Sequence, residues 1–334
     1  MKLAVLSPVA WRTPPRHYGP WEQVASNICE GMSDEGIDVT LFATKDSLTK
    51  AKLEAVIDKG YEEDKTVNAK VAECLHISHL MEMADDFDLI HNNFDFLPLT
   101  YSRLIGTPML TTIHGFSSPT IIPVYKKYND TNYYVSISNS DRSPELRYIA
   151  TVYNGVNENL FTVNPYHGNY LLFFSRIHPD KGTYEAIQIA KKCKMKLLIA
   201  GIIQDEKYFE EKVKPYINND DIIYLGSAGP EKRNELLGNA IALLHPISFN
   251  EPFGLSVVEA MFCGTPVIAF NRGSMPELIE DTKTGFIVSD IDEAARSVSE
   301  VRYLNRLYIA EYSRNKFSIH QMIKNYLQVY KNIL

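Results

Sequence analysis

HPISFNEPFGLSVVEAMFCGTPVIAF, residues 245–270, is the stretch around which the rest of the chain is organised. It begins as an apolar strand, passes through a polar loop into a short helix, and ends in a second apolar strand. A proline follows Glu251 and cannot occupy a helix interior, so Glu251 is expected in the loop. Glu259 is expected on the first or second turn of a helix that opens near Gly254. The two carboxylates are therefore expected to face one concave place from two different elements.

The start of this helix is a candidate anion site. Backbone N–H groups in the first turn of a helix have no partner within the helix, and they make its N-terminus electropositive. Here these groups belong to Phe253, Gly254, Leu255 and Ser256. We expect them to hold a phosphate, with a group rich in hydroxyls beside it.

The overall composition is that of a folded protein with room for more than one core. The chain has 334 residues, of which 45% are hydrophobic and 22% charged, and this length allows two domains. A net charge of -7 provides no basic field for the phosphates of a nucleic acid, so we expect no nucleic-acid partner. The apolar runs are too short for a signal peptide or a membrane span. We expect a cytoplasmic protein with at most peripheral membrane contact.

Strand patterns alternate with helical patterns along the chain, which is typical of parallel sheets covered by helices on both faces. Residues 46–70 are charged and compatible with a helix. A segment rich in Asn and Gly, 154–169, separates two α/β halves. We predict an α/β protein with two Rossmann-like domains facing each other across a cleft, over residues 1–160 and 161–315. Residues 316–334 carry an apolar stripe at helical spacing, which needs a surface to cover.

The first strand leads into a long loop of unusual composition. Residues 7–22 hold four prolines, two arginines and both tryptophans of the chain. Long connections at the carboxyl ends of strands are where open α/β sheets bind ligands, and Gly19 lets the backbone approach one closely. A rigid structural loop is the alternative. If the loop binds an acceptor, its ring-stacking and cationic side chains are the candidates: Trp11, Arg12, Arg16, His17 and Trp21.

Two other strand ends carry candidate site residues. His114 ends the strand predicted over 108–115, on the same sheet edge as the first loop. Arg176 and Lys181 follow the strand predicted over 170–175, beside the Glu251 loop. A forked guanidinium and an ammonium match the charge of a diphosphate leaving group. Taken alone, these residues are weak evidence, because solvated strand ends carry the same residue types.

In this order the motifs resemble those of the retaining glycosyltransferases of family 4, which have the GT-B architecture, over nearly the full length of the chain. The shared motifs are EPFGLSVVE at 251–259, Arg176 with Lys181 and Gly182, TIHG at 112–115, YNGV at 153–156, and YGPWE at 18–22. The family's first loop usually contains paired glycines, whereas here a proline follows Gly19. In this fold the terminal helix commonly returns to the N-terminal domain, so we expect residues 316–334 to pack there. A dimer contact or a membrane-surface helix is the alternative.

The resemblance implies an acceptor-binding N-terminal domain and a nucleotide-sugar-binding C-terminal domain. The donor-binding residues that it implies are Gly19, Arg176, Lys181, Glu251, Phe253, Gly254, Leu255 and Glu259.

Among these, Glu259 would bind the ribose hydroxyls, and Glu251 would hold the transferred sugar. Arg176 and Lys181 would bind the diphosphate, and His114 would contact the sugar near its reacting carbon.

The implied reaction moves a hexosyl group from a nucleoside diphosphate sugar to an acceptor hydroxyl with retention at the anomeric carbon. We expect no cofactor and no metal, because Arg176 and Lys181 would neutralise the leaving group. UDP-hexose is the favoured donor and GDP-mannose its rival. The acceptor is a small molecule, a lipid-linked sugar or a polysaccharide. A sugar-nucleotide epimerase, a phosphorylase of the same architecture, and a non-catalytic nucleotide-sugar-binding protein are the alternatives.

Overall fold

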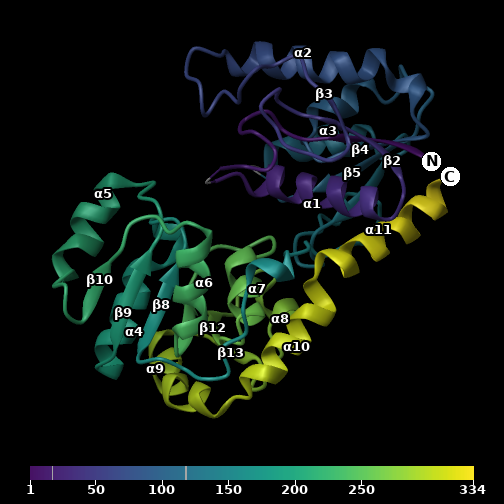
Figure 1. The fold of residues 1–334 in the computed structure, drawn as a ribbon. Coiled ribbons are helices and arrows are strands. Elements are labelled where there is room, and N and C mark those ends of the chain that lie inside the picture. The colour runs from purple at the N-terminus through teal and green to yellow at the C-terminus, as the bar shows by residue number, and fades with distance from the viewer. Residues whose placement is uncertain (17, 117–118) are drawn as a thin grey trace. The chain divides into compact units, whose positions relative to one another are not determined.

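The computed structural model describes residues 1–16, 18–116 and 119–334. The chain divides into two compact units: unit 1 is Met1–Gly155 with Ile319–Leu334, and unit 2 is Val156–Ser318. Unit 1 is thus assembled from both ends of the chain, and unit 2 from the segment between them (Figure 1). The divisions lie a few residues from the positions 160 and 315 that the sequence suggests.

Unit 1 is built on a parallel sheet. Among the described residues, this sheet has seven strands in the order β3-β2-β1-β4-β5-β6-β7. The strands are β1 (Lys2–Leu6), β2 (Asp38–Phe42), β3 (Lys52–Glu54), β4 (Leu89–Asn92), β5 (Met109–Ile113), β6 (Tyr133–Ser136) and β7 (Tyr148–Thr151). The α-helices are α1 (Pro20–Asp34), α2 (Ala69–Glu82), α3 (Ile122–Lys127) and α11 (Ile319–Ile333). Residues 46–70, whose composition is compatible with a helix, instead hold turns and the edge strand β3, and α2 begins only at the end of this range.

Helices cover both faces of the unit 1 sheet. Successive side chains of a strand point to opposite faces. Accordingly, Leu3 and Val5 of β1 pack with residues of α1 and α11, whereas Ala4 and Leu6 pack with residues of α2 and α3. In Figure 1, α1 and α2 lie on opposite sides of the strands. Burial on both faces explains why β1 is continuously apolar from Leu3 to Leu6 rather than alternating.

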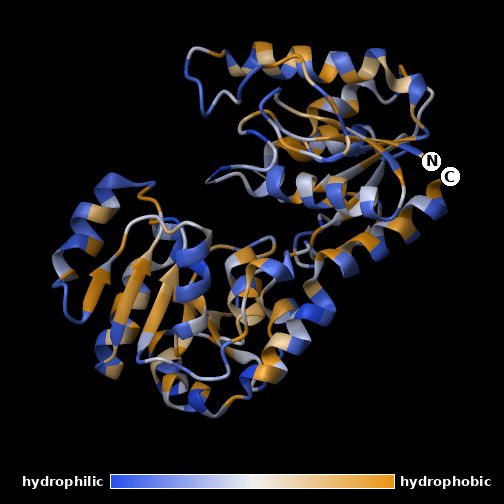
Figure 2. Ribbon diagram, in the orientation of Figure 1, coloured by the Kyte–Doolittle hydropathy of each residue, from blue (hydrophilic) through white to orange (hydrophobic). Residues whose placement is uncertain are grey.

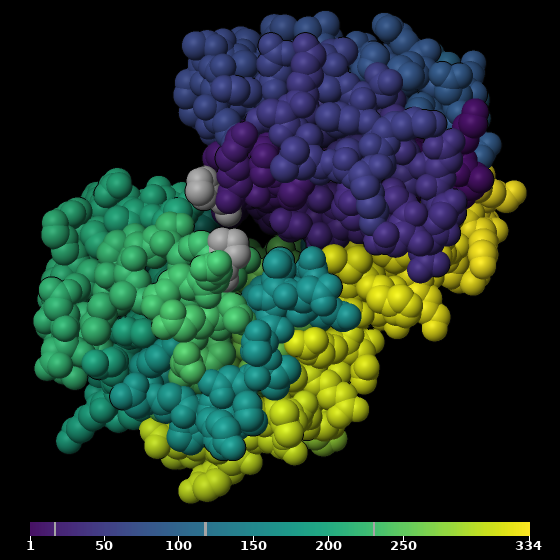
Figure 3. All heavy atoms as spheres, in the orientation of Figure 1, coloured from purple at the N-terminus to yellow at the C-terminus, as the bar shows by residue number. Residues whose placement is uncertain are grey.

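The C-terminal helix α11 belongs to the core of unit 1. Its buried side chains are Met322, Ile323, Tyr326, Val329 and Tyr330. A Cβ placed on Gly31 of α1 would lie 2.4 Å from Ile323, so the glycine lets the two helices approach closely. The Tyr330 hydroxyl also lies 2.6 Å from Nδ1 of His91 in β4. Figure 3 shows yellow C-terminal residues directly against the purple N-terminal ones.

Unit 2 repeats the same plan. Among the described residues, its six-stranded parallel sheet has the order β10-β9-β8-β11-β12-β13. The strands are β8 (Tyr170–Phe174), β9 (Lys196–Ala200), β10 (Ile222–Tyr224), β11 (Ala242–His245), β12 (Val267–Phe270) and β13 (Gly285–Val288). The α-helices are α4 (Thr183–Cys193), α5 (Glu206–Tyr208), α6 (Pro230–Asn239), α7 (Leu255–Phe262), α8 (Met275–Leu278), α9 (Ile291–Glu300) and α10 (Arg306–Phe317).

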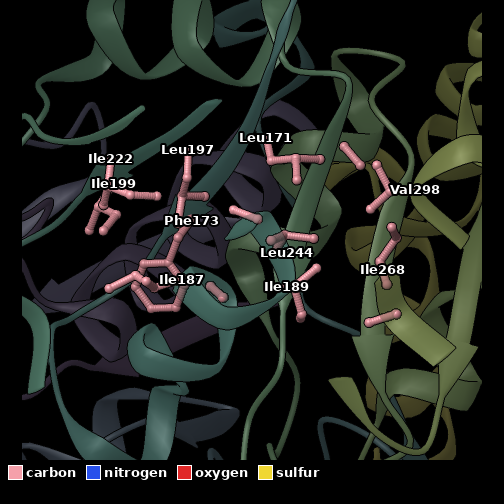
Figure 4. Packing of buried hydrophobic residues seen from close by; sticks show 14 of the residues in the cluster. Leu171, Phe173, Ile187, Ile189, Leu197, Ile199, Ile222, Leu244, Ile268 and Val298 are labelled. Carbon is pink, nitrogen blue, oxygen red and sulfur yellow. The ribbon is translucent and has the colours of Figure 1, made fainter. Parts of the chain in front are cut away.

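One core cluster of unit 2 lies between its sheet and the helices α4 and α9. Phe173, Leu197 and Leu244 come from three neighbouring strands, and they pack with Ile187 of α4 and Val298 of α9 (Figure 4). Figure 2 shows β8, β9 and β10 as hydrophobic strands. This packing fixes the positions of the strand ends from which the polar loops start.

Both sheets have the strand order of a Rossmann fold, in which strands are added outward in two directions from a central one. The direction reverses between β1 and β4 in unit 1, and between β8 and β11 in unit 2. Open α/β sheets bind ligands outside the carboxyl ends of the strands at such a switch point. Two Rossmann-like domains are therefore confirmed, while the cleft between them stays a prediction. In the described part of the chain, none of the helices combines the length and apolar character needed to cross a bilayer.

Candidate active site

A buried ion pair lies at the switch point of unit 2. Lys181 follows β8 and Glu251 follows β11, and these two strands are neighbours in the sheet. Nζ of Lys181 lies 2.5 Å from a carboxylate oxygen of Glu251, with the two side chains only 10% and 14% exposed. Nζ also lies 4.5 Å from the centre of the Phe249 ring. The structure therefore brings together two residues that are 70 positions apart in the sequence.

Close backbone contact holds the two loops in place. Gly182 has a φ of 75°, a conformation that favours glycine. A Cβ at this position would lie 2.0 Å from the carbonyl oxygen of Pro246 in the neighbouring loop. The backbone N–H of Ser248 donates to the carbonyl oxygen of Asp180 at 2.9 Å. Lys181 is thus fixed against the Glu251 loop by the main chain as well as by its charge.

The Glu251 loop is also held from the side of α8. The Ser274 N–H donates to the carbonyl oxygen of Glu251 at 3.0 Å, and the Ser274 hydroxyl donates to that of Phe253 at 2.5 Å. A Cβ on Gly273 would lie 2.3 Å from the Glu251 carbonyl oxygen, so only glycine fits there without a shift. The carboxylate of Glu251 is therefore presented from a rigid loop.

Helix α7 begins where the sequence predicts. Gly254, with a φ of 101°, precedes its first residue, and Glu259 lies on the second turn. The prediction that Glu251 lies in the loop and Glu259 on the helix is confirmed. The helix N-terminus follows the loop directly, as an anion site requires.

Glu259 has a partner that the sequence analysis did not single out. Nη1 of Arg233, on α6, donates to a Glu259 oxygen at 2.8 Å, and the guanidinium lies 5.9 Å from the centre of the Phe174 ring. The Glu259 side chain is 13% exposed. Burial raises the pKa of its carboxyl group, and the charge and hydrogen bond of Arg233 oppose that rise. Arg233 thus favours the ionised form, which accepts hydrogen bonds.

Arg176 lies in the loop directly after β8, and its guanidinium donates to the side-chain oxygen of Gln204. The isolated bridge between Ile177 and Ile203 holds this loop beside the one that follows β9. Arg176 and Lys181 therefore leave the same strand, five positions apart.

In unit 1, His114 follows β5 and lies close to two other residues of the sheet's carboxyl edge. Its Nε2 lies 3.1 Å from Oδ1 of Asn93, which follows β4, and its ring stacks on Trp21 with ring centres 5.8 Å apart. Burial lowers the pKa of His114 to about 3, so the ring is neutral near pH 7. Because Oδ1 can only accept, the ring proton lies on Nε2 and Nδ1 is left as an acceptor.

A buried acid lies under the first loop. Glu22, on the first turn of α1, accepts a hydrogen bond from the backbone N–H of Trp11 at 3.2 Å. A Cβ on Gly19, whose φ is 153°, would lie 2.9 Å from the other Glu22 oxygen. Burial raises the pKa of Glu22 to about 7. The loop therefore folds back over its own helix start.

The cationic candidates of the first loop contact acids of unit 1. Arg16 lies 2.6 Å from Glu63 and 3.1 Å from Asp46, and its side chain is 44% exposed. The backbone N–H of Arg12 donates to Glu63 at 2.9 Å. His17, a further candidate, lies outside the described residues. An acceptor-binding role for these side chains stays a prediction, and the charge of Arg16 is already neutralised.

The sequence analysis did not identify Arg233, Asn93 or Glu22 as site residues. Only weak indications of these three residues are present in the sequence. Asn93 directly follows β4 as His114 directly follows β5, and Glu22 is an acid in the first turn of α1. Arg233 sits on a strongly polar helix with no distinguishing spacing.

The fold is that of the GT-B glycosyltransferases. Among solved structures with this fold, Anabaena Alr3699/HepE in complex with UDP and glucose has a TM-score of 0.76 and 18% identity. The match covers 99% of this chain and 100% of that one.

The sequence of unit 2 is similar to a known family. Residues 161–316 match the model of the family "Glycosyl transferases group 1". An uncharacterized 41.2 kDa protein in the cps region of Klebsiella pneumoniae is 30% identical over 172 residues, 48% of this chain and 46% of that protein. The D-inositol 3-phosphate glycosyltransferase of Mycolicibacterium smegmatis is 31% identical over 189 residues, 50% of this chain and 42% of that protein. The chain thus spans less than half the length of these curated relatives.

Proposed function

We propose that this protein transfers a hexosyl group from a nucleoside diphosphate sugar to an acceptor hydroxyl, with retention at the anomeric carbon. The observation that carries the proposal is the buried Lys181–Glu251 pair at the switch point of unit 2, inside the region that matches glycosyl transferases group 1. A cation for the leaving group and a carboxylate for sugar hydroxyls are what such a transfer requires at one place.

Within this proposal, the residues of unit 2 bind the donor. Arg176 and Lys181 bind the diphosphate, to which Lys181 can offer three N–H donors. Glu251 accepts hydrogen bonds from the transferred sugar, together with the backbone at the start of α7. Glu259, whose ionised form Arg233 favours against the effect of burial, accepts hydrogen bonds from the ribose hydroxyls.

In the transfer step, the bond between the anomeric carbon and the diphosphate oxygen breaks, and the acceptor oxygen attacks from the same face. The acceptor proton passes to the leaving phosphate oxygen, so no protein carboxylate forms a covalent intermediate. We assign to His114 the contact with the sugar near its reacting carbon. Its neutral ring, with Nε2 held by Asn93, offers Nδ1 as an acceptor.

We propose UDP-hexose as the donor, with GDP-mannose as the rival. Support for the first comes from Anabaena HepE, which has the same fold and whose structure contains UDP and glucose. Arg176 and Lys181 supply positive charge at the diphosphate, so we propose a reaction that needs no metal. Trp11, Trp21 and the arginines of the first loop are the proposed acceptor contacts.

Release of the free nucleoside diphosphate tests this function. The protein is incubated with a panel of UDP- and GDP-sugars, an acceptor extract and EDTA, and free UDP and GDP are quantified. We expect release with one donor class, stimulated by acceptor and unaffected by EDTA. The same donor should raise the melting temperature, since a ligand at 100 times its Kd adds about 2.7 kcal/mol to stability. If no donor is turned over with or without added Mg²⁺, the proposed function is wrong.

A further inference from the structure

His245, the last residue of β11, has a buried ring nitrogen without a hydrogen bond. The residue is 3% exposed, and its Nε2 has no partner among the described residues. The same Nε2 lies 3.8 Å from Oε2 of Glu251. Lys181 occupies that carboxylate at 2.5 Å. The imidazole is therefore placed next to the acid and just beyond hydrogen-bonding range of it.

An unpaired polar group in a buried place costs free energy, so such groups are normally paired. An N–H···O bond is about 2.9 Å long, so a closing movement of about 1 Å between Nε2 and the carboxylate would complete one here. Burial, together with the charge of Lys181 and against that of Glu251, lowers the pKa of His245 to about 4. The ring is then neutral near pH 7, and it can donate one hydrogen bond without adding a charge.

In the proposed function, binding of the donor creates a state in which Glu251 needs the hydrogen bond from His245. When a diphosphate arrives, the ammonium of Lys181 is attracted to it and its hold on Glu251 weakens. Glu251 must keep its orientation to receive the sugar hydroxyls, and a buried carboxylate that loses a donor needs another. The charged and titratable groups that act on His245 are Glu251 and Lys181, and its unpaired Nε2 lies 3.8 Å from Oε2 of Glu251.

We propose that His245 is a positioning residue, which donates a hydrogen bond to Glu251 when the donor diphosphate draws Lys181 away. This inference rests on the proposed function of the Lys181–Glu251 site. It assigns His245 no contact with the substrate: the ring acts through Glu251. A glutamine can substitute for it, because its side-chain amide carries an N–H donor at the reach of Nε2.

Substitutions of His245 test the proposal by separating turnover from nucleotide binding. His245→Phe keeps a flat ring but removes the donor, and His245→Gln restores a donor. Leu244→Val is the packing control, because Leu244 precedes His245 on β11 and lies in the apolar core (Figure 4). We expect His245→Phe to lower kcat by about 10-fold or more, with the Kd for UDP, measured by calorimetry, unchanged within about twofold. His245→Gln and Leu244→Val should stay within about threefold of wild type in both quantities.

A spectroscopic measurement covers the case in which His245→Phe does not fold. In ¹⁵N-histidine-labelled wild-type protein, addition of UDP should shift the Nε2–H signal of His245 downfield as the new bond forms. In Glu251→Gln protein that still binds UDP, the shift should be smaller or absent. An unchanged signal in UDP-bound wild type, or equal loss of kcat in His245→Phe and His245→Gln, overturns the proposal while leaving the transferase function in place. If wild-type protein releases no nucleoside diphosphate with any donor, both the proposed function and this inference are wrong.

Discussion

Units 1 and 2 share one strand order, yet their switch points carry different chemistry. At the edge of unit 2, the acids Glu251 and Glu259 each pair with a cation. At the edge of unit 1, the buried groups are the neutral His114 and Asn93, and the protonatable Glu22. The common topology thus supplies two similar positions, and the loop residues decide which of them is suited to a diphosphate.

The largest expected effect comes from breaking the charged pair of unit 2. Lys181→Met should lower turnover about 10²- to 10³-fold, the scale of losing one donor that stabilises developing charge. Steady-state release of the nucleoside diphosphate measures it. Lys283→Met removes a lysine paired with Glu280 at 2.5 Å on the exposed surface of the same unit, and should leave turnover unchanged. If the turnover of Lys181→Met stays within about threefold of wild type, Lys181 does not stabilise the leaving diphosphate.

The next effect concerns the buried acid of unit 1 and the pH dependence of stability. The pKa of Glu22 is raised from 4.5 to about 7, so the folded protein holds a proton that the unfolded chain releases in this window. The free energy of unfolding should therefore decrease as the pH rises from about 4.5 to about 7. At 1.36 kcal/mol per pKa unit, the contribution is at most ~3 kcal/mol.

Urea unfolding of wild type and Glu22→Gln at about pH 5 and pH 8 measures this contribution. We expect the stability difference between the two pH values to shrink in Glu22→Gln, with Glu145→Gln, an exposed acid of unit 1, as the control. If Glu22→Gln keeps the full wild-type difference in stability between the two pH values, Glu22 is ionised at both. The edge of unit 1 then carries a buried negative charge.

The two acids of unit 2 should differ from each other. Glu259→Ala should raise the donor KM about 10- to 100-fold, since hydrogen bonds to charged groups contribute about 1.5–3 kcal/mol. Glu251→Ala should act chiefly on kcat, because in the proposed function Glu251 orients the sugar being transferred. Initial rates over a range of donor concentrations separate the two effects. Equal changes in KM and kcat for both variants would refute the division of tasks.

The smallest effect is expected in the first loop. Arg16→Ala should raise the acceptor KM only a few-fold and leave donor hydrolysis intact, because exposed ion pairs contribute little. Arg147→Ala, which removes another exposed arginine paired with an acid in unit 1, is the matched control. An acceptor KM identical to that of both wild type and the control would restrict Arg16 to a structural role.

The architecture and the charged residues of the unit 2 site could be predicted from the sequence, and the reason is physical. Apolar strands and helical spacing are local patterns, and a proline after Glu251 with a glycine before α7 fixes where loop becomes helix. The proximity of Lys181 to Glu251 also followed, because loops after neighbouring parallel strands meet at one edge.

Partners that depend on tertiary packing could not be predicted in the same way. Arg233 and Glu259 are 26 positions apart on different helices, and Arg16 and Glu63 are 47 apart. Nothing in the local sequence distinguishes these arginines from solvated ones. Residues 46–70 do not form the helix with which their composition is compatible, since charge alone does not determine secondary structure without an apolar face to bury.

The return of α11 to unit 1 has a consequence for the order of events during synthesis. The ribosome makes a chain from its N-terminus, so all of unit 2 has been synthesised before Met322, Ile323 and Tyr326 are added to cover α1 and β1. The apolar face of unit 1 that α11 covers therefore stays exposed in the nascent chain until unit 2 has been synthesised. We expect unit 2 to reach its native state first, although unit 1 begins the chain.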